Sequence, residues 1–98
     1  MGTEQSINIA IIGAGRGGTA LIELFTRCHG ITITGIADAN PDAPGLRLAR
    51  NLNIPATTDP VSLVADKTVD LIVDVTGNHA MPALIERHKS ARDRKSVV

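Results

Sequence analysis

The sequence has almost no aromatic side chains, one cysteine and no excess of charge. Tryptophan and tyrosine are absent and Phe25 is the only aromatic residue, so the core must be built from aliphatic side chains. The lone Cys28 excludes an internal disulfide, which fits a reducing cytoplasm. Ten basic and ten acidic residues give a formal net charge of zero, which argues against a general nucleic-acid or membrane-surface binder.

Long hydrophobic segments are lacking as well. No apolar run approaches the length of a membrane span. The polar stretch from Met1 to Ser6 has no hydrophobic region of the signal-peptide kind. A chain of 98 residues is long enough for one packed core. We therefore expect a single domain over residues 1–98, without a membrane partner and located in the cytoplasm.

The strongest signal is a glycine-rich turn between a strand and a helix. The apolar run Ile7–Ile12 predicts a strand buried on both faces, as in the centre of a parallel sheet. Residues 17–29 predict a helix, whose apolar side is formed by Leu21, Leu24, Phe25 and Cys28. The sequence Gly13-Ala14-Gly15-Arg16-Gly17-Gly18 lies between them, so this G-x-G-x-x-G string has the context of a dinucleotide-binding turn.

Each glycine of the G-x-G-x-x-G string has a physical task. Gly13 allows a sharp turn out of the strand, and Gly15 lets a pyrophosphate come close to the backbone. Gly18 lets the new helix lie close to the strand, and the free N–H groups of its first turn favour an anion. The alternative is a glycine-rich turn inside an α/β fold that binds nothing.

An acidic residue follows the second predicted strand, residues 31–37. Asp38 comes about twenty residues after Gly18, at the usual place of an acid that binds the adenosine ribose. Its carboxylate can accept hydrogen bonds from both ribose hydroxyls and would repel a 2′-phosphate. Ala39 and Asn40 come next, so no arginine is offered to such a phosphate. The sequence predicts NAD rather than NADP as the cofactor.

Strand and helix patterns alternate along the rest of the chain. Residues 54–57 predict a short edge strand, because Pro55 lacks a backbone donor. Residues 69–75 predict a fourth strand, and residues 95–98 the start of a fifth. Right-handed crossovers then predict a Rossmann-like α/β fold, with a parallel sheet of order 3-2-1-4, possibly 5, and helices on both faces. Ligands of such sheets lie at the carboxyl ends of the strands, where the loop of Thr76, Gly77 and Asn78 faces the glycine-rich turn.

Three stretches resemble known NAD-binding domains: IIGAGRGG, GIADANPDAPGLRLARNLNIPATTD and VDLIVDVTGNHA. They are similar to the N-terminal domain of acylating acetaldehyde dehydrogenases, of homoserine dehydrogenases and of the glucose–fructose oxidoreductase/inositol dehydrogenase family. The resemblance covers about residues 7–88 and implies a pyrophosphate cradle in the glycine-rich turn, a ribose held by Asp38 and a nicotinamide side lined by residues 76–78. With the two residues after Asp38, the predicted cofactor-binding set is Gly13, Gly15, Arg16, Gly17, Gly18, Asp38, Ala39, Asn40, Thr76, Gly77 and Asn78.

The sequence also departs from these families. In all of them the chemistry belongs to a second domain, and the cysteine nucleophile of the acylating enzymes has no match here. We expect Cys28 to be a small buried hydrophobe of the first helix. The lysine-containing motif of the glucose–fructose family is also absent. We therefore predict no catalytic residue within this chain.

Other candidate chemistry is sparse. His79 follows the fourth strand, where it could touch the cofactor, although a polar residue at a helix start is the simpler interpretation. Asp74 lies near the end of that strand and is expected to brace the following loop rather than act as a base. No histidine has a carboxylate or cysteine at ligand spacing, so no metal site is predicted.

Three functions from different classes fit these observations. We favour a non-catalytic NAD(H)-binding or sensing module that serves a signalling or catalytic partner. The alternatives are the cofactor half of an NAD-dependent dehydrogenase and a structural domain used for association. A homodimer is also expected, because little covers the side of the fourth strand, whose apolar residues would form an exposed patch. The residues named for that patch are Leu71, Ile72, Val73, Met81 and Leu84.

Overall fold

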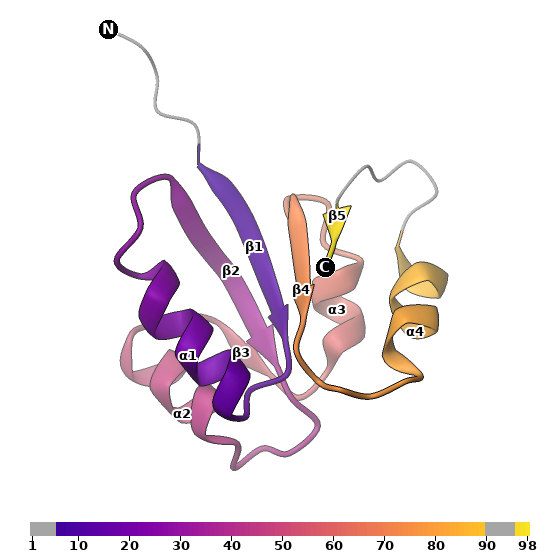
Figure 1. Cartoon of the computed structure of the whole chain (residues 1–98), viewed down its shortest axis with the longest axis horizontal. Coiled ribbons are helices and arrows are strands. Elements are labelled where there is room, and N and C mark those ends of the chain that lie inside the picture. Colours follow the sequence, from indigo (N-terminus) through magenta and orange to yellow (C-terminus); the bar gives the residue numbers. More distant parts are fainter. Residues whose placement is uncertain (1–5, 90–95) are drawn as a thin grey trace, which may run out of the picture.

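The computed structural model describes residues 6–89 and 96–98. Five strands form one parallel sheet in the order β3-β2-β1-β4-β5 (Figure 1). Their bounds are β1 Ile7–Ile12, β2 Ile31–Ala37, β3 Ala56–Thr57, β4 Leu71–Asp74 and β5 Ser96–Val97. The predicted Rossmann-like order is therefore confirmed, including the fifth strand. Lys95, the first residue predicted for that strand, lies outside the described residues.

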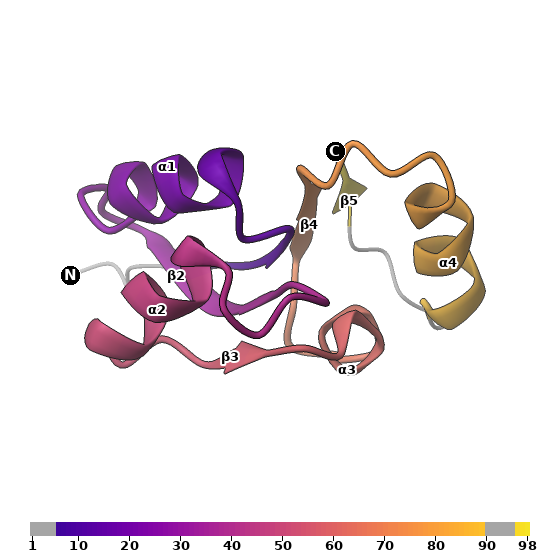
Figure 2. The same cartoon turned by 90° about the horizontal axis from the view of Figure 1, so that it is seen from below.

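Four helices connect the strands: α1 Arg16–Phe25, α2 Pro44–Asn51, α3 Pro60–Val64 and α4 Met81–His88. α1 and α2 lie on one side of the sheet, α3 lies on the other side, and α4 lies beyond β5 (Figure 2). Two hydrophobic clusters fill the two sides, one containing Ile22 and Leu46 and the other containing Val64 and Ile85. No helix among the described residues is long and apolar enough to cross a membrane.

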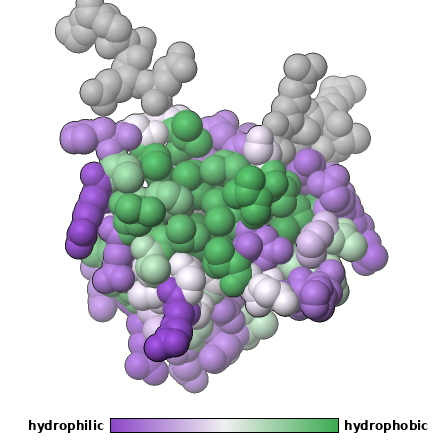
Figure 3. Space-filling model, in the orientation of Figure 1, coloured by the Kyte–Doolittle hydropathy of each residue, from purple (hydrophilic) through white to green (hydrophobic). Residues whose placement is uncertain are grey.

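The side of the sheet that carries α1 is only partly covered. Figure 3 shows a large hydrophobic area in the upper centre of this side. Ile7 and Leu24 are 50% and 55% exposed. The half-buried apolar residues that pack against the cluster of this side include Leu21, Phe25, Ile31, Ile33, Leu71 and Val73.

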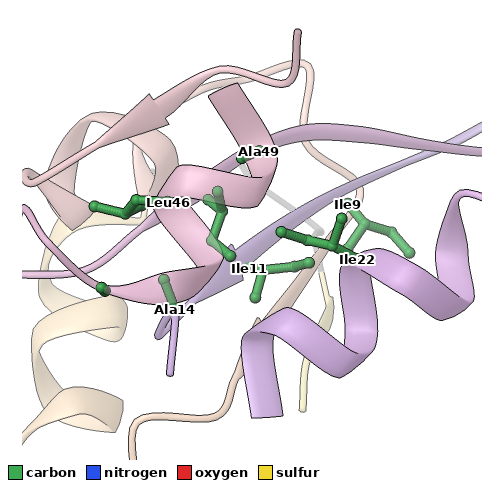
Figure 4. Packing of buried hydrophobic residues seen from close by; sticks show 8 residues of the cluster. Ile9, Ile11, Ala14, Ile22, Leu46 and Ala49 are labelled. Carbon is green, nitrogen blue, oxygen red and sulfur yellow. The ribbon is translucent and has the colours of Figure 1, made fainter. Parts of the chain in front are cut away.

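β1 is buried on both faces, as the sequence predicts. Ile9 and Ile11 belong to the cluster beneath α1 and α2, whereas Ala10 and Ile12 belong to the cluster beneath α3 and α4. Figure 4 shows the first of these clusters, in which Ile9 and Ile11 of β1 lie among side chains of α1 and α2. Burying both faces of a strand requires an unbroken apolar run, and residues 9–12 of β1 supply it.

The helix starts follow local signals in two cases and depart from them in one. Pro44 and Pro60 lie in the first turns of α2 and α3, as expected. Asp59 caps α3 by accepting a hydrogen bond from the N–H of Val61. Aspartate commonly caps helices, so the sequence also predicts that Asp42 caps α2. This prediction is wrong, because Ala43 is the N-cap residue of that helix and no side chain caps it.

The end of α1 differs from the expected one. The helix ends at Phe25, and Cys28 lies in the following turn with an exposed side chain, so its prediction as a buried residue of the helix is wrong. Leu24 is exposed, while Gly18 and Ile22 form the buried side of α1. Gly18 and Ile22 are four residues apart and therefore lie on the same face of the helix, which packs on the sheet. Leu24 is two positions after Ile22, so its side chain points away from that face. Gly30 directly follows the predicted helix of residues 17–29, where a glycine with positive φ is typical of a helix end. Its φ is 79°, but it lies in a turn beyond the observed helix end.

Candidate functional site

The carboxyl ends of β1, β2 and β4 meet around a cavity of about 330 Å³. This volume lies within the range of about 300–1,000 Å³ that is usual for ligand pockets. Its position agrees with the rule that α/β sheets bind ligands where the strand order changes direction. The cavity is lined by Ile12, Gly13, Gly15, Ala37, Asp38, Ala39, Pro60, Val75, Thr76, Asn78 and Met81.

The glycine-rich turn leaves β1 with backbone geometry that needs glycine. Gly13 has φ of +109°, a conformation that side chains rarely adopt, and its N–H donates to the carbonyl oxygen of Ala37 at 2.7 Å. A Cβ added at Gly18 would overlap the carbonyl oxygen of Gly13. The first helix therefore lies directly against the turn, as the motif predicts.

The start of α1 is open toward the cavity. A Cβ added at Gly15 would meet no atom within 4 Å, apart from its own chain neighbours. Gly15 is the N-cap of α1, no side chain caps this helix, and no acidic residue stands in its first turn. Its first N–H groups and its dipole are thus available to an anion that approaches the exposed backbone.

Asp38 connects the ends of β1 and β2. Its Oδ2 accepts the N–H of Ala14 at 2.8 Å, and its Oδ1 accepts the N–H of Asn40 at 2.9 Å. Ala14 is fully buried, so its N–H needs an acceptor from the protein. A carboxylate has about four lone-pair sites, so both oxygens can accept further bonds from a ligand. The carboxylate therefore fixes the turn as well as lining the cavity.

The glycine-rich turn has a second contact that the motif did not reveal. The N–H of Gly45 donates to the carbonyl oxygen of Ala14 at 2.7 Å, so α2 and Asp38 hold the same residue from two sides. A Cβ at Gly45 would lie 2.7 Å from that oxygen and 2.9 Å from Cα of Ala14. A glycine inside a helix is unfavourable by itself, and this was the available signal for a close approach.

The loop after β4 is ordered by its own side chains. Oδ1 of Asp74 accepts the N–H of Thr76 at 3.0 Å and its hydroxyl at 2.7 Å, which confirms the expected brace. The hydroxyl oxygen of Thr76 accepts the N–H of Asn78 at 3.0 Å. Gly77, between them, has φ of 65°. Thr76 and Asn78 line the same cavity as Asp38 and Ala39.

The structure brings six of the predicted residues to the cavity: Gly13, Gly15, Asp38, Ala39, Thr76 and Asn78. The other five do not line it: Arg16, Gly17, Gly18, Asn40 and Gly77. Sequence reasoning missed the apolar lining, which comes from Ile12, Ala37, Pro60, Val75 and Met81. Three of these stand at strand ends, which was a usable signal, whereas Pro60 and Met81 arrive through the packing of α3 and α4.

Other candidate chemistry remains away from this cavity. His79 is exposed in the loop before α4 and does not line the cavity. The described residues contain no group of three or more histidine, cysteine, aspartate or glutamate side chains that could hold a metal ion. The cavity therefore offers a ligand backbone N–H donors, one carboxylate that can accept hydrogen bonds and an apolar wall.

Residues 7–93 match the family described as "Oxidoreductase family, NAD-binding Rossmann fold". The chain belongs to this family. The resemblance stated from the sequence is confirmed, and so is NAD as the cofactor class. The acetaldehyde dehydrogenase of Chloroflexus aurantiacus is 32% identical over 78 residues, which make up 78% of this chain and 26% of that protein.

Solved structures of oxidoreductases share this fold. An oxidoreductase from Agrobacterium radiobacter, in complex with NAD+, L-tartaric acid and magnesium, is 26% identical with a TM-score of 0.68, over 88% of this chain and 25% of that one. The apo scyllo-inositol dehydrogenase from Lactobacillus casei is 21% identical with a TM-score of 0.74, over 98% of this chain and 28% of that one. The chain thus spans about a quarter of the length of these relatives.

Proposed function

We propose that the cavity at the carboxyl ends of β1, β2 and β4 binds NAD(H). The observation that carries this proposal is the exposed backbone at Gly15, where a Cβ would project into open space beside an uncapped helix start. A pyrophosphate fits there, bound by the first N–H groups of α1, with Arg16 and Gly17 at the same helix end. Asp38 and the neighbouring Ala39 and Asn40 would hold the adenosine ribose, and the loop of Thr76, Gly77 and Asn78 would face the nicotinamide side.

The family favours an oxidoreductase role for the bound cofactor over a sensing role. Its members are described as oxidoreductases, and bound NAD supplies the hydride acceptor of such reactions. The groups that line the cavity are mostly backbone and aliphatic. We propose that this domain binds and orients the cofactor, while the substrate meets groups outside the described residues. A sensing or signalling module remains the alternative in which no substrate is turned over.

The first test concerns the choice between NAD and NADP. Asp38→Ala should weaken NAD binding, because the ribose loses a charged acceptor worth about 1.5–3 kcal/mol, or roughly 10- to 150-fold in Kd. NADP binding should weaken less, because the carboxylate that repels the 2′-phosphate is removed as well. Calorimetric titration of both cofactors into both proteins gives the ratio of their Kd values.

The ratio of the Kd values for NAD and NADP distinguishes a loss of ribose recognition from a general destabilisation of the turn. Asp38→Ala also leaves the buried N–H of Ala14 without its acceptor, so a lower Tm is expected. A purely structural loss would weaken both cofactors equally and leave the ratio unchanged. Asp42→Ala is the matched control, since Asp42 is an exposed acid in the same loop that does not line the cavity. Wild-type protein that binds NADP as tightly as NAD would show that Asp38 is misassigned.

We propose in addition that the domain is a homodimer. Figure 3 shows a hydrophobic area on the α1 side of the sheet, where the half-buried Leu71 and Val73 pack against the core cluster. Leu24 of α1 and Ile7 of β1 are exposed apolar residues as well. Large apolar patches are uncommon on monomers, and a twofold axis is the commonest way to cover one. Two residues expected in the patch do not belong to it: Ile72 is fully buried in the cluster on the opposite side of the sheet, and Met81 packs against that same cluster.

Light scattering tests the dimer. We expect twice the monomer mass at tens of micromolar protein. Leu24→Glu should shift the mass to that of the monomer without changing the fold, because it places a charge on an exposed apolar residue of α1, the helix on the side of the proposed contact. Leu52→Glu is the matched control, since Leu52 is also exposed, at 46%, but stands at the end of α2. A monomer mass for the wild-type protein would contradict the dimer.

A further inference from the structure

The loop between β4 and α4 is held by a chain of hydrogen bonds that begins at one carboxylate. Asp74, half-buried at the end of β4, accepts both the N–H and the hydroxyl of Thr76 with its Oδ1. Thr76 accepts the N–H of Asn78 with its hydroxyl oxygen at 3.0 Å. Asn78 accepts the N–H of Ala80 with its Oδ1 at 2.9 Å. Each bond spans two residues, so together they define the path of residues 74–80.

The same chain of bonds determines which polar groups the loop can offer. The hydroxyl proton of Thr76 is directed to Asp74, at 2.7 Å. The side-chain oxygen of Asn78 is engaged by Ala80, which leaves its Nδ2 as a donor without a partner among the described residues. Asn78 lines the cavity, so the loop presents an N–H donor to an acceptor atom of a ligand.

Both ends of the loop are anchored. At one end the N–H of Asp74 donates to the carbonyl oxygen of Val98 at 2.7 Å, and the N–H of Val75 donates to the carbonyl oxygen of Ile12 at 2.9 Å. At the other end the N–H of Met81 donates to the carbonyl oxygen of Asn78 at 3.0 Å, and α4 begins with Met81. Three lining residues, Thr76, Asn78 and Met81, therefore depend on the conformation that Asp74 imposes.

We propose that Asp74 is a positioning residue for the nicotinamide half of the cofactor. This inference rests on the proposed NAD(H) site. The carboxylate does not line the cavity, so it acts through Thr76 and Asn78 rather than on the ligand itself. The adenosine half would be contacted by Asp38 and the glycine-rich turn, whereas the hydrogen bonds of the Asp74 carboxylate go to Thr76. Loss of the carboxylate therefore affects the two halves of the cofactor unequally.

Titration of NAD and of ADP-ribose, which lacks only the nicotinamide, tests this proposal. Asp74→Ala should weaken NAD about tenfold and ADP-ribose less than about twofold, since the loop loses two charge-assisted bonds. Asp74→Asn keeps an acceptor oxygen and should bind both ligands like the wild type. Asp70→Ala is the matched control, because Asp70 also accepts a backbone N–H, from Asn8, but does not line the cavity. Asp70→Ala should leave the Kd of NAD and that of ADP-ribose unchanged.

Amide hydrogen exchange provides a second measurement that needs no ligand. In Asp74→Ala the N–H groups of Thr76, Asn78 and Ala80 should exchange faster, while those of β1 keep their protection. Equal weakening of NAD and ADP-ribose, unchanged NAD binding, or the same NAD-specific loss in Asp70→Ala would overturn the positioning role. Wild-type protein that binds neither ligand would instead contradict the proposed function, and this inference with it.

Discussion

The Gly15→Val variant is expected to fold normally and to bind no NAD. The added side chain meets no protein atom within 4 Å of its Cβ, so the domain gains no clash. It does fill the space through which a pyrophosphate approaches the start of α1. Titration calorimetry should detect no binding at cofactor concentrations that saturate the wild type, while the thermal unfolding curve stays within a few degrees of it.

The control for Gly15→Val is a smaller side chain at the same glycine, rather than valine at another glycine. Gly77→Val is unsuitable, since its φ of 65° would strain any side chain. Gly15→Ala is the graded companion: its single methyl group should weaken NAD binding less than valine does. If Gly15→Val is folded and binds NAD with the wild-type Kd, the pyrophosphate does not lie at this turn.

Gly18→Ala, unlike Gly15→Val, should cause a large loss of stability. Its Cβ would overlap the carbonyl oxygen of Gly13, which is backbone and cannot rotate away. Overpacking usually costs about 1–3 kcal/mol, and a backbone obstacle should put this variant at the upper end or above. For a domain of this size we expect Tm to fall by roughly 10 °C or more. Differential scanning calorimetry of the variant and the wild type measures this fall in Tm.

Thr19→Ala is a suitable control for Gly18→Ala. It adds no volume, and it removes one side-chain bond, in which the hydroxyl donates to the carbonyl oxygen of Gly15 at 2.7 Å. Its Tm should fall far less. A Gly18→Ala variant with the Tm of the wild type would mean that α1 can move away from the turn without loss, and that the close approach of helix and strand is not needed.

The fold and half of the candidate site were predictable because they depend on local patterns. The buried strand of residues 7–12 and the glycines that follow it each leave a signature within a few residues. Asp38 was recognised by its distance from the turn and by its place at a strand end. Parallel strands with right-handed crossovers then bring these separate signals to one edge of the sheet.

What could not be predicted depends on contacts between distant segments. Leu21, Ile22, Leu24 and Phe25 are all apolar, so periodicity alone could not decide which of them faces the sheet. The packing of Ile22 into the core decided it and left Leu24 exposed. The contact of Gly45 with Ala14 joins residues far apart in the sequence. Pro60 and Met81 reach the cavity only because α3 and α4 pack where they do.

The bond from Ala14 to Asp38 has a consequence for how cofactor preference can evolve in this protein. If Asp38 holds the ribose as proposed, a lineage that changes toward NADP must remove a carboxylate that would repel the 2′-phosphate. The same carboxylate is the acceptor of a buried N–H in the glycine-rich turn. A single substitution at position 38 therefore alters specificity and weakens the turn together. Asparagine or serine, which retain an acceptor oxygen, are more accessible first steps than arginine, which has none. The hydrogen bond within the protein, from the N–H of Ala14 to Asp38, thus limits which substitutions at position 38 can change the cofactor.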